Sequence, residues 1–375
     1  MNFALSENEE MLKALAERFV LDRYDLDRRR TYQQAATGFS QENWRLLGEL
    51  GLLAAPLPQS CGGLDIDGTS LAVLCEALGH GLVVEPVIEN VVLAARLLAG
   101  AGATDAAAPV LAGLATGETR VAVAHAEVGG RGGRPWVETA ARRESGGWVI
   151  TGKKSCVPAG AGVRAYIVSA RTAGQPRDAA GVGLWLVPAD APGLVAQPWR
   201  TIDGGMAVSL DLCGVCLDAA ACLPGGVAEL GAAQAVAQLA RGAEALGIME
   251  RMLAETAEYL RTREQFGTKL SGFQALQHRM VAQYAIKEQA RGLLNRAVVA
   301  WECSGFQQAA AGLAAYVAKV VVGFGHEMIQ FHGGMGVTDE LAIGHAHKRL
   351  AMLSRWPHSP DVALDLYAHR LHEAK

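Results

Sequence analysis

The stretch "RTREQFGTKLSGFQ", residues 261–274, combines residue types that suit an aromatic, phosphate-bearing ligand. Arg263 offers a rigid fork of N–H donors that fits a phosphodiester. Phe266 adds an apolar plate before a glycine turn, and Gln274, expected one turn into the next helix, has an amide that both donates and accepts. A helix opening near Ser271 would point backbone N–H groups outward, which favours an anion. Charged residues followed by glycine also occur at ordinary helix corners, so this stretch alone leaves a purely structural role open.

A second stretch, "QFHGGMGVTDE", repeats the combination of a glutamine with glycines. Gln330 precedes the tandem Gly333 and Gly334. Glycines without a Cβ let a backbone approach a ligand closely. The two stretches together favour a ligand site over a simple helix corner.

Three zones of the chain must position these residues. Up to about residue 120 the apolar residues recur at helical spacing, and Ser40 is placed to cap a helix. From 121 to 225 short apolar runs alternate with Gly, Pro and Asp, which is typical of an antiparallel barrel or sandwich. Long helical stripes return after 226. The expected fold is mainly α with an inserted β domain: an N-terminal helical domain (1–120), a middle β domain (121–225) and a C-terminal helical bundle (226–375).

Composition excludes several classes of function. The net charge of −4 supplies no electrostatic reason to bind nucleic acid or an anionic membrane. The most apolar stretches fall short of the ~18 uninterrupted residues that a bilayer span requires. Acidic residues near the start, and no unbroken apolar run there, argue against an export signal. Seven cysteines without framework spacing indicate a reduced setting, so we expect a cytoplasmic protein.

Neither cysteines nor histidines predict a metal centre. Cys213 and Cys216 form a CxxC, followed by Cys222, but no fourth ligand lies at a helpful spacing. We expect these three to be buried or half-buried structural thiols. His345 and His347 lie two apart, on opposite sides of a helix, which is poor geometry for one metal ion.

The order of the zones and the two motifs resemble the acyl-CoA dehydrogenases. "RTREQFGTKLSGFQALQHRM" stands at the corner between two long helices, and "QFHGGMGVTDE" follows the third. Those enzymes bind FAD, remove two hydrogens from an acyl-CoA thioester and pass electrons to an electron-transferring flavoprotein. The resemblance implies that a set of six residues contacts the adenine and pyrophosphate side of an FAD whose flavin is held mainly by the neighbouring subunit. The six are Arg263, Phe266, Gln274, Gln330, Gly333 and Gly334.

The sequence departs from the family where the catalytic base is expected. Most members carry a glutamate downstream of the GGxG motif, before a Gly-Thr pair; here that region reads "AMLSRWPHSP", without a carboxylate. Other members carry the base on the first long helix after the β domain, at the position of Ala237. Glu340 is retained, but the family has it in addition to the base, and a helix-capping acid is the alternative. The catalytic residue therefore stays unknown.

The half of the pocket that would hold the flavin ring is also altered. The family's Thr-Glu-Pro-Gly-Ala-Gly-Ser-Asp loop and Trp-Ile-Thr strand correspond to "AEVGGRGG" and "CVP". Glu127 is kept, whereas the hydroxyl residues are absent and Pro158 has no N–H to donate. Arg131 and Arg134 offer positive charge for a coenzyme A phosphate, with a solvated loop as the alternative.

The sequence keeps residues for the adenine side of FAD but lacks the base and the flavin-ring pocket. This combination suggests that another subunit supplies the missing parts. The sequence is similar to the small subunits of two-subunit members, such as pimeloyl-CoA and steroid side-chain dehydrogenases, which end soon after "GHxxKR"; here "GHAHKRLAM" matches. We expect pairing with a larger homologue in an α2β2 assembly, in fatty acid or steroid catabolism. Two alternatives stay open: a homo-oligomer with its own FAD and a non-standard base or altered reaction, or a non-catalytic assembly partner without flavin.

Overall fold

The computed structural model describes residues 4–100, 107–130 and 135–373, and the chain divides into two compact units. The helical unit comprises Met1–Arg30, Gly68–Val83 and Gln238–Lys375. The sheet unit comprises Thr31–Asp67 and Val84–Ala237.

Helices dominate the ends of the chain, as predicted. Before the sheet they are α1 (Glu7–Arg23), α2 (Leu26–Gln34), α3 (Gln41–Glu49), α4 (Gly68–His80), the π-helix η2 (Ile88–Leu93), α5 (Ala94–Gly100) and α6 (Ala108–Thr116), with a 3-10 turn η1 (Gln59–Cys61). The side chain of Ser40 accepts a hydrogen bond from the backbone N–H of Asn43 at 3.2 Å. The predicted cap on α3 is therefore confirmed.

Five further α-helices follow the sheet in the part of the chain that the structure describes. They are α7 (Val227–Thr262), α8 (Gln274–Val299), α9 (Phe306–His332), α10 (Ala342–Leu353) and α11 (Pro360–Glu373). Helix α9 packs against α8, α10 and α11. Leu313, Phe324 and Met328 of α9 are completely buried, which explains the large share of apolar residues in this helix.

One segment would pass as a membrane span on length and apolar composition alone. It runs over Phe306–Val337, and 56% of its most apolar 18-residue window is buried inside the fold. A core helix has the same composition because it is surrounded by other protein segments.

The described part of the chain forms a sheet of eight strands. They are β1 (Val121–Ala124), β2 (Ala140–Glu144), β3 (Gly147–Pro158), β4 (Ala165–Arg171), β5 (Val182–Pro188), β6 (Leu194–Arg200), β7 (Met206–Leu217) and β8 (Cys222–Leu223). The order is β6-β7-β3-β2-β4-β5-β8, with β1 beside β4. Pairing is antiparallel except for β1 and β2 against β4.

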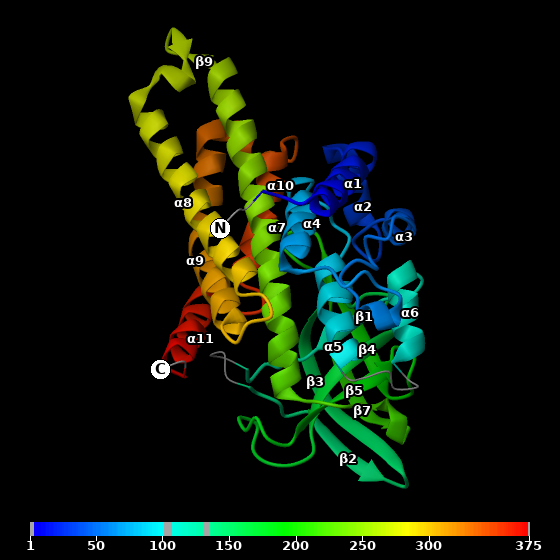
Figure 1. Ribbon diagram of the computed structural model, residues 1–375. Helices are drawn as coiled ribbons and strands as arrows, with labels where there is room; N and C mark the ends of the chain where they lie inside the picture. The colour runs from blue at the N-terminus through cyan, green and yellow to red at the C-terminus, as the bar shows by residue number, and fades with distance from the viewer. Residues whose placement is uncertain (1–3, 101–106, 131–134, 374–375) are drawn as a thin grey trace. The chain divides into compact units, whose positions relative to one another are not determined.

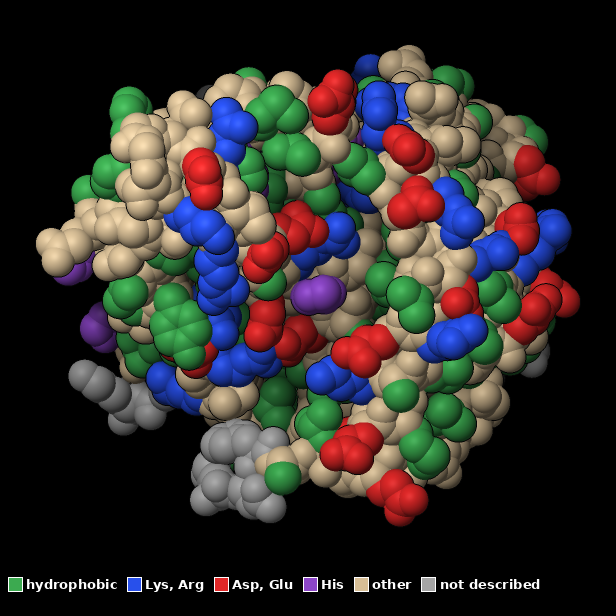
Figure 2. Space-filling model, turned by 90° about the horizontal axis from the view of Figure 1, so that it is seen from above, with side chains coloured by type: hydrophobic (Ala, Val, Ile, Leu, Met, Phe, Trp, Pro, Cys, Tyr) green, Lys and Arg blue, Asp and Glu red, His purple; other side chains and the backbone are tan. Residues whose placement is uncertain are grey.

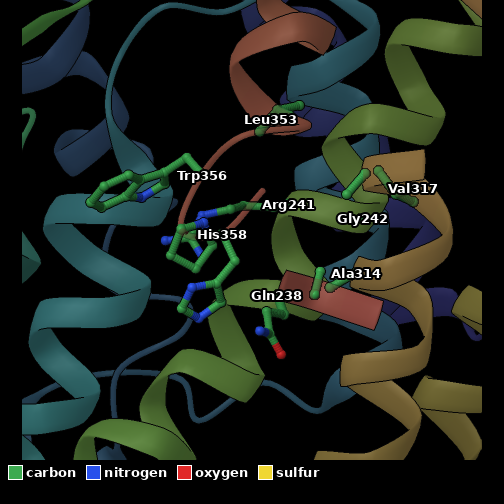
Figure 3. Close-up of a pocket in the computed structure, with 11 residues that line it drawn as sticks. Gln238, Arg241, Gly242, Ala314, Val317, Leu353, Trp356 and His358 are labelled. Atoms are coloured by element: carbon green, nitrogen blue, oxygen red, sulfur yellow. The ribbon is translucent and has the colours of Figure 1, made fainter. Parts of the chain in front are cut away.

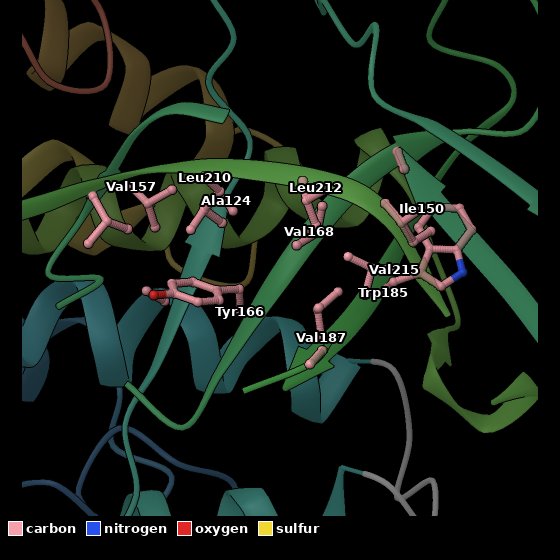
Figure 4. Close-up of a cluster of buried hydrophobic side chains, with 14 of the residues drawn as sticks. Ala124, Ile150, Val157, Tyr166, Val168, Trp185, Val187, Leu210, Leu212 and Val215 are labelled. Atoms are coloured by element: carbon pink, nitrogen blue, oxygen red, sulfur yellow. The ribbon is translucent and has the colours of Figure 1, made fainter. Parts of the chain in front are cut away.

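This sheet is not closed into a barrel, which corrects one of the two predicted arrangements. The order begins at β6 and ends at β8, so both are edge strands. Short apolar runs between turns predict strands but do not say whether the first and last strands pair. Buried side chains cover the sheet in one cluster, in which Tyr166 and Trp185 are the largest (Figure 4).

The predicted burial of the CxxC thiols is wrong. Cys213 and Cys216 are exposed and Cys222 is half-buried; all seven cysteines are free. Strand β7 has an irregular register against β3 near Gly214, which adopts a φ of +67°. A bulge of this kind breaks strand alternation, so both thiols lie on the solvent side.

Candidate functional site

The corner after α7 is a small β-hairpin, an element that the sequence did not predict. Its strands are β9 (Glu264–Gln265) and β10 (Thr268–Lys269), and it lies at one end of the long helices (Figure 1). Phe266 and Gly267 form its turn with φ of +57° and +80°. Two consecutive residues of positive φ make the tight turn that suits hairpin twist.

Phe266 at the tip of this hairpin is 90% exposed. A bulky residue in the left-handed region is unusual and costs ~1–3 kcal/mol. Its ring meets Phe273 edge-on, with centroids 6.2 Å apart, and is otherwise open to solvent. The fold therefore presents an aromatic surface at this end of the helical unit.

Arg263 has a fixed backbone and a side chain without a partner. Its N–H donates to the carbonyl of Tyr259 at 2.8 Å, and its carbonyl accepts from Leu270 at 2.9 Å. The guanidinium is exposed and forms no hydrogen bond or ion pair with any residue that the structure describes. It is therefore available to an anion.

Gln274 is the first residue of α8, and not one turn into it as predicted. A 3-10 turn, η4 (Leu270–Gly272), occupies the region of Ser271 where we expected the helix to open. Phe273 is the N-cap and no side chain caps the helix. The N–H of Leu276 donates to the carbonyl of Phe273 at 3.0 Å, so among the described residues the N–H groups of Gln274 and Ala275 are left for solvent or an anion.

The second motif, at the end of α9, is also exposed to solvent. Helix α9 ends at His332, and Gly333 follows with φ +59° and ψ −140°, a conformation that is nearly restricted to glycine. A Cβ built on Gly333 or Gly334 would meet no atom within 4 Å. Gln330 is exposed on the last turn of the helix.

Side chains join the ends of the three helices that carry these motifs. Tyr259 on α7 stacks on His332 of α9, with ring centroids 4.5 Å apart. Arg279 on α8 pairs with Glu327 of α9 at 2.8 Å and lies over the ring of Phe331 at 5.2 Å.

The six predicted residues are therefore all exposed, at one end of the helical unit. Figure 2 looks down on this end, where Lys and Arg side chains lie in a row near exposed hydrophobic ones. Arg261, Arg263 and Lys269 supply exposed positive charge in the corner.

In the sheet unit, the two segments predicted to replace the flavin-ring pocket lie side by side. Ala126 forms a β-bridge with Cys156, and its carbonyl accepts from the N–H of Ser155 at 2.9 Å. Pro158 ends β3 and is buried. Arg131 and Arg134 lie outside the described residues.

Glu127 in this region is bound by protein groups, a feature that the sequence did not reveal. Its carboxylate pairs with Lys154 at 2.6 Å and accepts from the N–H of Glu138 at 2.6 Å and the hydroxyl of Thr139 at 2.7 Å. Burial favours a higher pKa for Glu127, but the charge of Lys154 and these hydrogen bonds hold that pKa below its ordinary value. Burial lowers the pKa of Lys154 to about 8, although Glu127 opposes the shift. The tandem lysines of β3 were the available signal, since alternation sends one of two neighbours inward.

Comparison with known proteins decides the family. Residues 6–118, 124–219 and 230–371 match the N-terminal, middle and C-terminal domains of acyl-CoA dehydrogenases. The chain is 30% identical to the acyl-CoA dehydrogenase FadE27 of Mycobacterium tuberculosis, across 95% of this chain and 98% of that protein. The chain belongs to the acyl-CoA dehydrogenase family. Members are flavoprotein oxidoreductases, and membership supports FAD as the cofactor.

Solved structures of acyl-CoA dehydrogenase relatives have the same fold over almost the whole chain. The ChsE4–ChsE5 complex from Mycobacterium tuberculosis has a TM-score of 0.91 and 27% identity, over 100% of this chain and 99% of that chain. A Tcur3481–Tcur3483 steroid ACAD variant has a TM-score of 0.88 and 30% identity, over 98% of each chain.

Neither position at which the sequence analysis expected the base carries a carboxylate. Ala237 is completely buried in α7. The segment 351–360 runs from the end of α10 to the start of α11 and contains a cis bond between Trp356 and Pro357. Burial, and next the charge of Arg241, lower the pKa of His358 to about 4, so this imidazole is neutral and a weak base at pH 7.

The remaining candidates are Glu340, which faces solvent, and His345 and His347, which contact other side chains. Glu340 is exposed and does not cap α10, whose N-cap is Leu341 without a side-chain bond. Arg29 donates to His345 at 3.2 Å, whereas the ring of His347 lies 4.7 Å from that of His326. Among the described residues no group of three or more His, Cys, Asp and Glu side chains could hold a metal ion.

Proposed function

We propose that this chain is one subunit of a heteromeric acyl-CoA dehydrogenase. It holds the adenine and pyrophosphate side of FAD, and a homologous partner subunit supplies the base and most of the flavin-ring pocket. The assembly is an α2β2 tetramer that removes hydrogens from the α and β carbons of an acyl-CoA thioester and delivers electrons to an electron-transferring flavoprotein.

The observation that carries this proposal is the contrast between the two halves of the site. Arg263 and Phe266 are exposed, and among the described residues the guanidinium of Arg263 has no partner while Phe266 meets only the edge of Phe273. The two base positions, in contrast, hold Ala237 and a Trp-Pro-His segment. The chain keeps the groups expected to bind the nucleotide but lacks a group that could abstract the proton. This fits a chain that shares its cofactor with a partner subunit.

Each proposed FAD residue has a defined task. Arg263 neutralises a phosphate through its fork of donors, assisted by backbone N–H groups at the start of α8. Phe266 provides an apolar plate, Gln274 and Gln330 offer amide hydrogen bonds, and the backbone of Gly333 lets the nucleotide come close. When bound, FAD supplies the hydride acceptor for the reaction. These residues position it and do not take part in bond breaking.

The relatives support a mixed assembly and suggest a substrate class. Two solved structures, at 27% and 30% identity, are a ChsE4–ChsE5 complex and a Tcur3481–Tcur3483 steroid ACAD variant. By analogy we propose a bulky acyl-CoA, of a steroid side chain or fatty acid, as substrate, and we keep the prediction of a cytoplasmic location.

Copurification tests this proposal. We expect the tagged chain to retain a coexpressed homologous partner through size exclusion, with one FAD per pair and dehydrogenase activity in the pair only. If the tagged chain instead elutes alone as a yellow, active homo-oligomer, the chain uses a base of its own and the proposal is wrong. A pair that is active but keeps its flavin when Arg263 is replaced by alanine would remove the assignment of Arg263 to FAD binding.

A further inference from the structure

A hollow in the sheet unit is lined by charged groups that the proposed function does not use. It is formed by the start of α3, the link from α6 to β1, the link from β3 to β4 and the end of β5. Its volume is about 460 Å³, which is within the range of small-molecule sites. The niche of the helical unit in Figure 3 has about 30 Å³, room for about one water molecule. The hollow is therefore the better candidate for an organic ligand, and its chemistry depends on Glu118, Thr119, Arg120, Arg164 and Asp190.

Arg120 is a buried cation in the wall of this hollow. It is 6% exposed, and its guanidinium lies 4.7 Å from the centre of the Phe39 ring. It donates to the side-chain oxygen of Asn90 at 3.4 Å and to the carbonyls of Ala161 and Gly162 at 3.0 and 2.9 Å. A guanidinium has five N–H donors, so the Nε–H and one Nη1–H have no acceptor among the described residues.

The partners of Arg120 satisfy part of its hydrogen bonding but not its charge. Burial lowers the pKa of Arg120 to about 10, and the phenol of Tyr166 opposes this shift. Arg120 is therefore still a cation at pH 7, although no described carboxylate forms an ion pair with it. Because a buried charge is costly unless it is paired, an anionic group in the hollow would be favourable next to Arg120.

The other charges of the hollow are of both signs. Arg164, Glu118 and Asp190 are exposed, and none of them forms an ion pair with a described residue. Glu118 follows the C-terminal end of α6, where the helix dipole favours a cation. The wall therefore combines a positive part with a negative part, without an ion pair between them.

We propose that this hollow binds a small zwitterion, namely an amino acid or a dipeptide. Its carboxylate accepts hydrogen bonds from Arg120 and Arg164. Its ammonium group donates to Glu118 and Asp190, and the hydroxyl of Thr119 lines the same hollow. A simple anion would be repelled by the two carboxylates and a simple cation by the two arginines, so a ligand with both charges fits best. All these residues belong to the sheet unit, and the proposal depends neither on FAD nor on a partner subunit.

Calorimetric titration of the purified chain with alanylalanine tests this site. We expect saturable binding of this dipeptide. N-acetyl-alanylalanine lacks the ammonium group and alanylalanine amide lacks the carboxylate, so each should bind roughly tenfold more weakly. Free alanine separates the two sources: tighter binding of alanine than of the dipeptide assigns the site to an amino acid, and the reverse order assigns it to a peptide.

Two exposed side chains allow the site to be changed while the buried Arg120 stays in place. Arg164→Gln and Glu118→Gln should each weaken alanylalanine binding by roughly tenfold, because each removes one charge-assisted hydrogen bond. Arg143→Gln, at an exposed arginine of β2 outside the hollow, is the matched control and should bind like the unmodified chain. The proposal is overturned if the dipeptide gives no saturable heat, if its two blocked forms bind as tightly as the dipeptide, or if Arg164→Gln binds like Arg143→Gln.

Discussion

Two arginines of the corner lie two residues apart and differ in their surroundings. Arg261 faces Glu258, with 3.8 Å between guanidinium and carboxylate, and both side chains are about two-thirds exposed. Arg263 has no partner among the described residues. Exposed ion pairs contribute little to stability, so neither side chain is required for the fold. A difference in function between variants of the two arginines would therefore indicate that one of them binds a ligand.

Removing Arg263 should weaken FAD retention. For Arg263→Ala we expect a loss of ~1–3 kcal/mol in FAD affinity, because a charge-assisted bond to a phosphate is lost. Equilibrium dialysis of FAD with the assembled protein measures this loss, and Arg261→Ala is the matched control. Equal retention by both variants would remove the assignment of Arg263.

His358 should make stability depend on pH in a defined window. The pKa of His358 is about 4 in the folded chain, against an ordinary value of ~6.5. Between these values the unfolded chain binds more protons, so the folded state loses stability as pH falls from 6.5 towards 4. His358→Gln lacks this term, and its melting temperature should approach that of the unmodified chain with falling pH. A constant difference between the two melting curves across this window would contradict the assignment.

At the scale of elements, the end of α9 is the most constrained part of the candidate site. Gly333 stops the helix in a conformation that L side chains rarely adopt, although there is open space around it. Gly323, within α9, also has open space but a normal helical conformation. Backbone conformation, and not crowding, therefore distinguishes the two glycines.

Gly333→Ala should destabilise the protein by ~1–3 kcal/mol and weaken FAD binding, since the strained backbone shifts. Gly323→Ala should stabilise α9 by ~0.5–1 kcal/mol, because alanine favours helix. Urea unfolding and FAD titration of both variants check this pair. Comparable effects of the two substitutions would show that the conformation of Gly333 is not required.

Helices and strands could be predicted where apolar residues recur with a strong period. Elements that depend on the backbone conformation of a few residues could not. Apolar spacing located the long helices and the strands, and Ser40 marked a helix start. The β9–β10 hairpin was not predicted, because phenylalanine is not one of the residue types that indicate a turn of positive φ. The ion pair between Glu127 and Lys154 was not predicted. The two residues are distant in sequence, and only the register of the sheet brings them together. The six candidate FAD residues, which are exposed, stay a prediction that rests on their side-chain chemistry and on the family resemblance.

At the scale of the whole molecule, we propose that another chain completes the surface that holds the candidate FAD residues. Phe266 there is 90% exposed, Arg263 has no partner among the described residues, and α8 begins without a side-chain cap. The domain boundaries that we proposed, 1–120, 121–225 and 226–375, coincide with changes in sequence periodicity, and limited proteolysis near 120 and 225 would check them.

The flavin content of the purified protein tests the shared cofactor most directly. Absorbance at the flavin band, divided by protein concentration, gives the stoichiometry of the chain alone and of the chain with its homologous partner. We predict little flavin and no thioester oxidation for the chain alone, and one FAD per pair with restored activity. A chain that by itself carries one FAD per polypeptide and oxidises acyl-CoA at full rate would contradict this account.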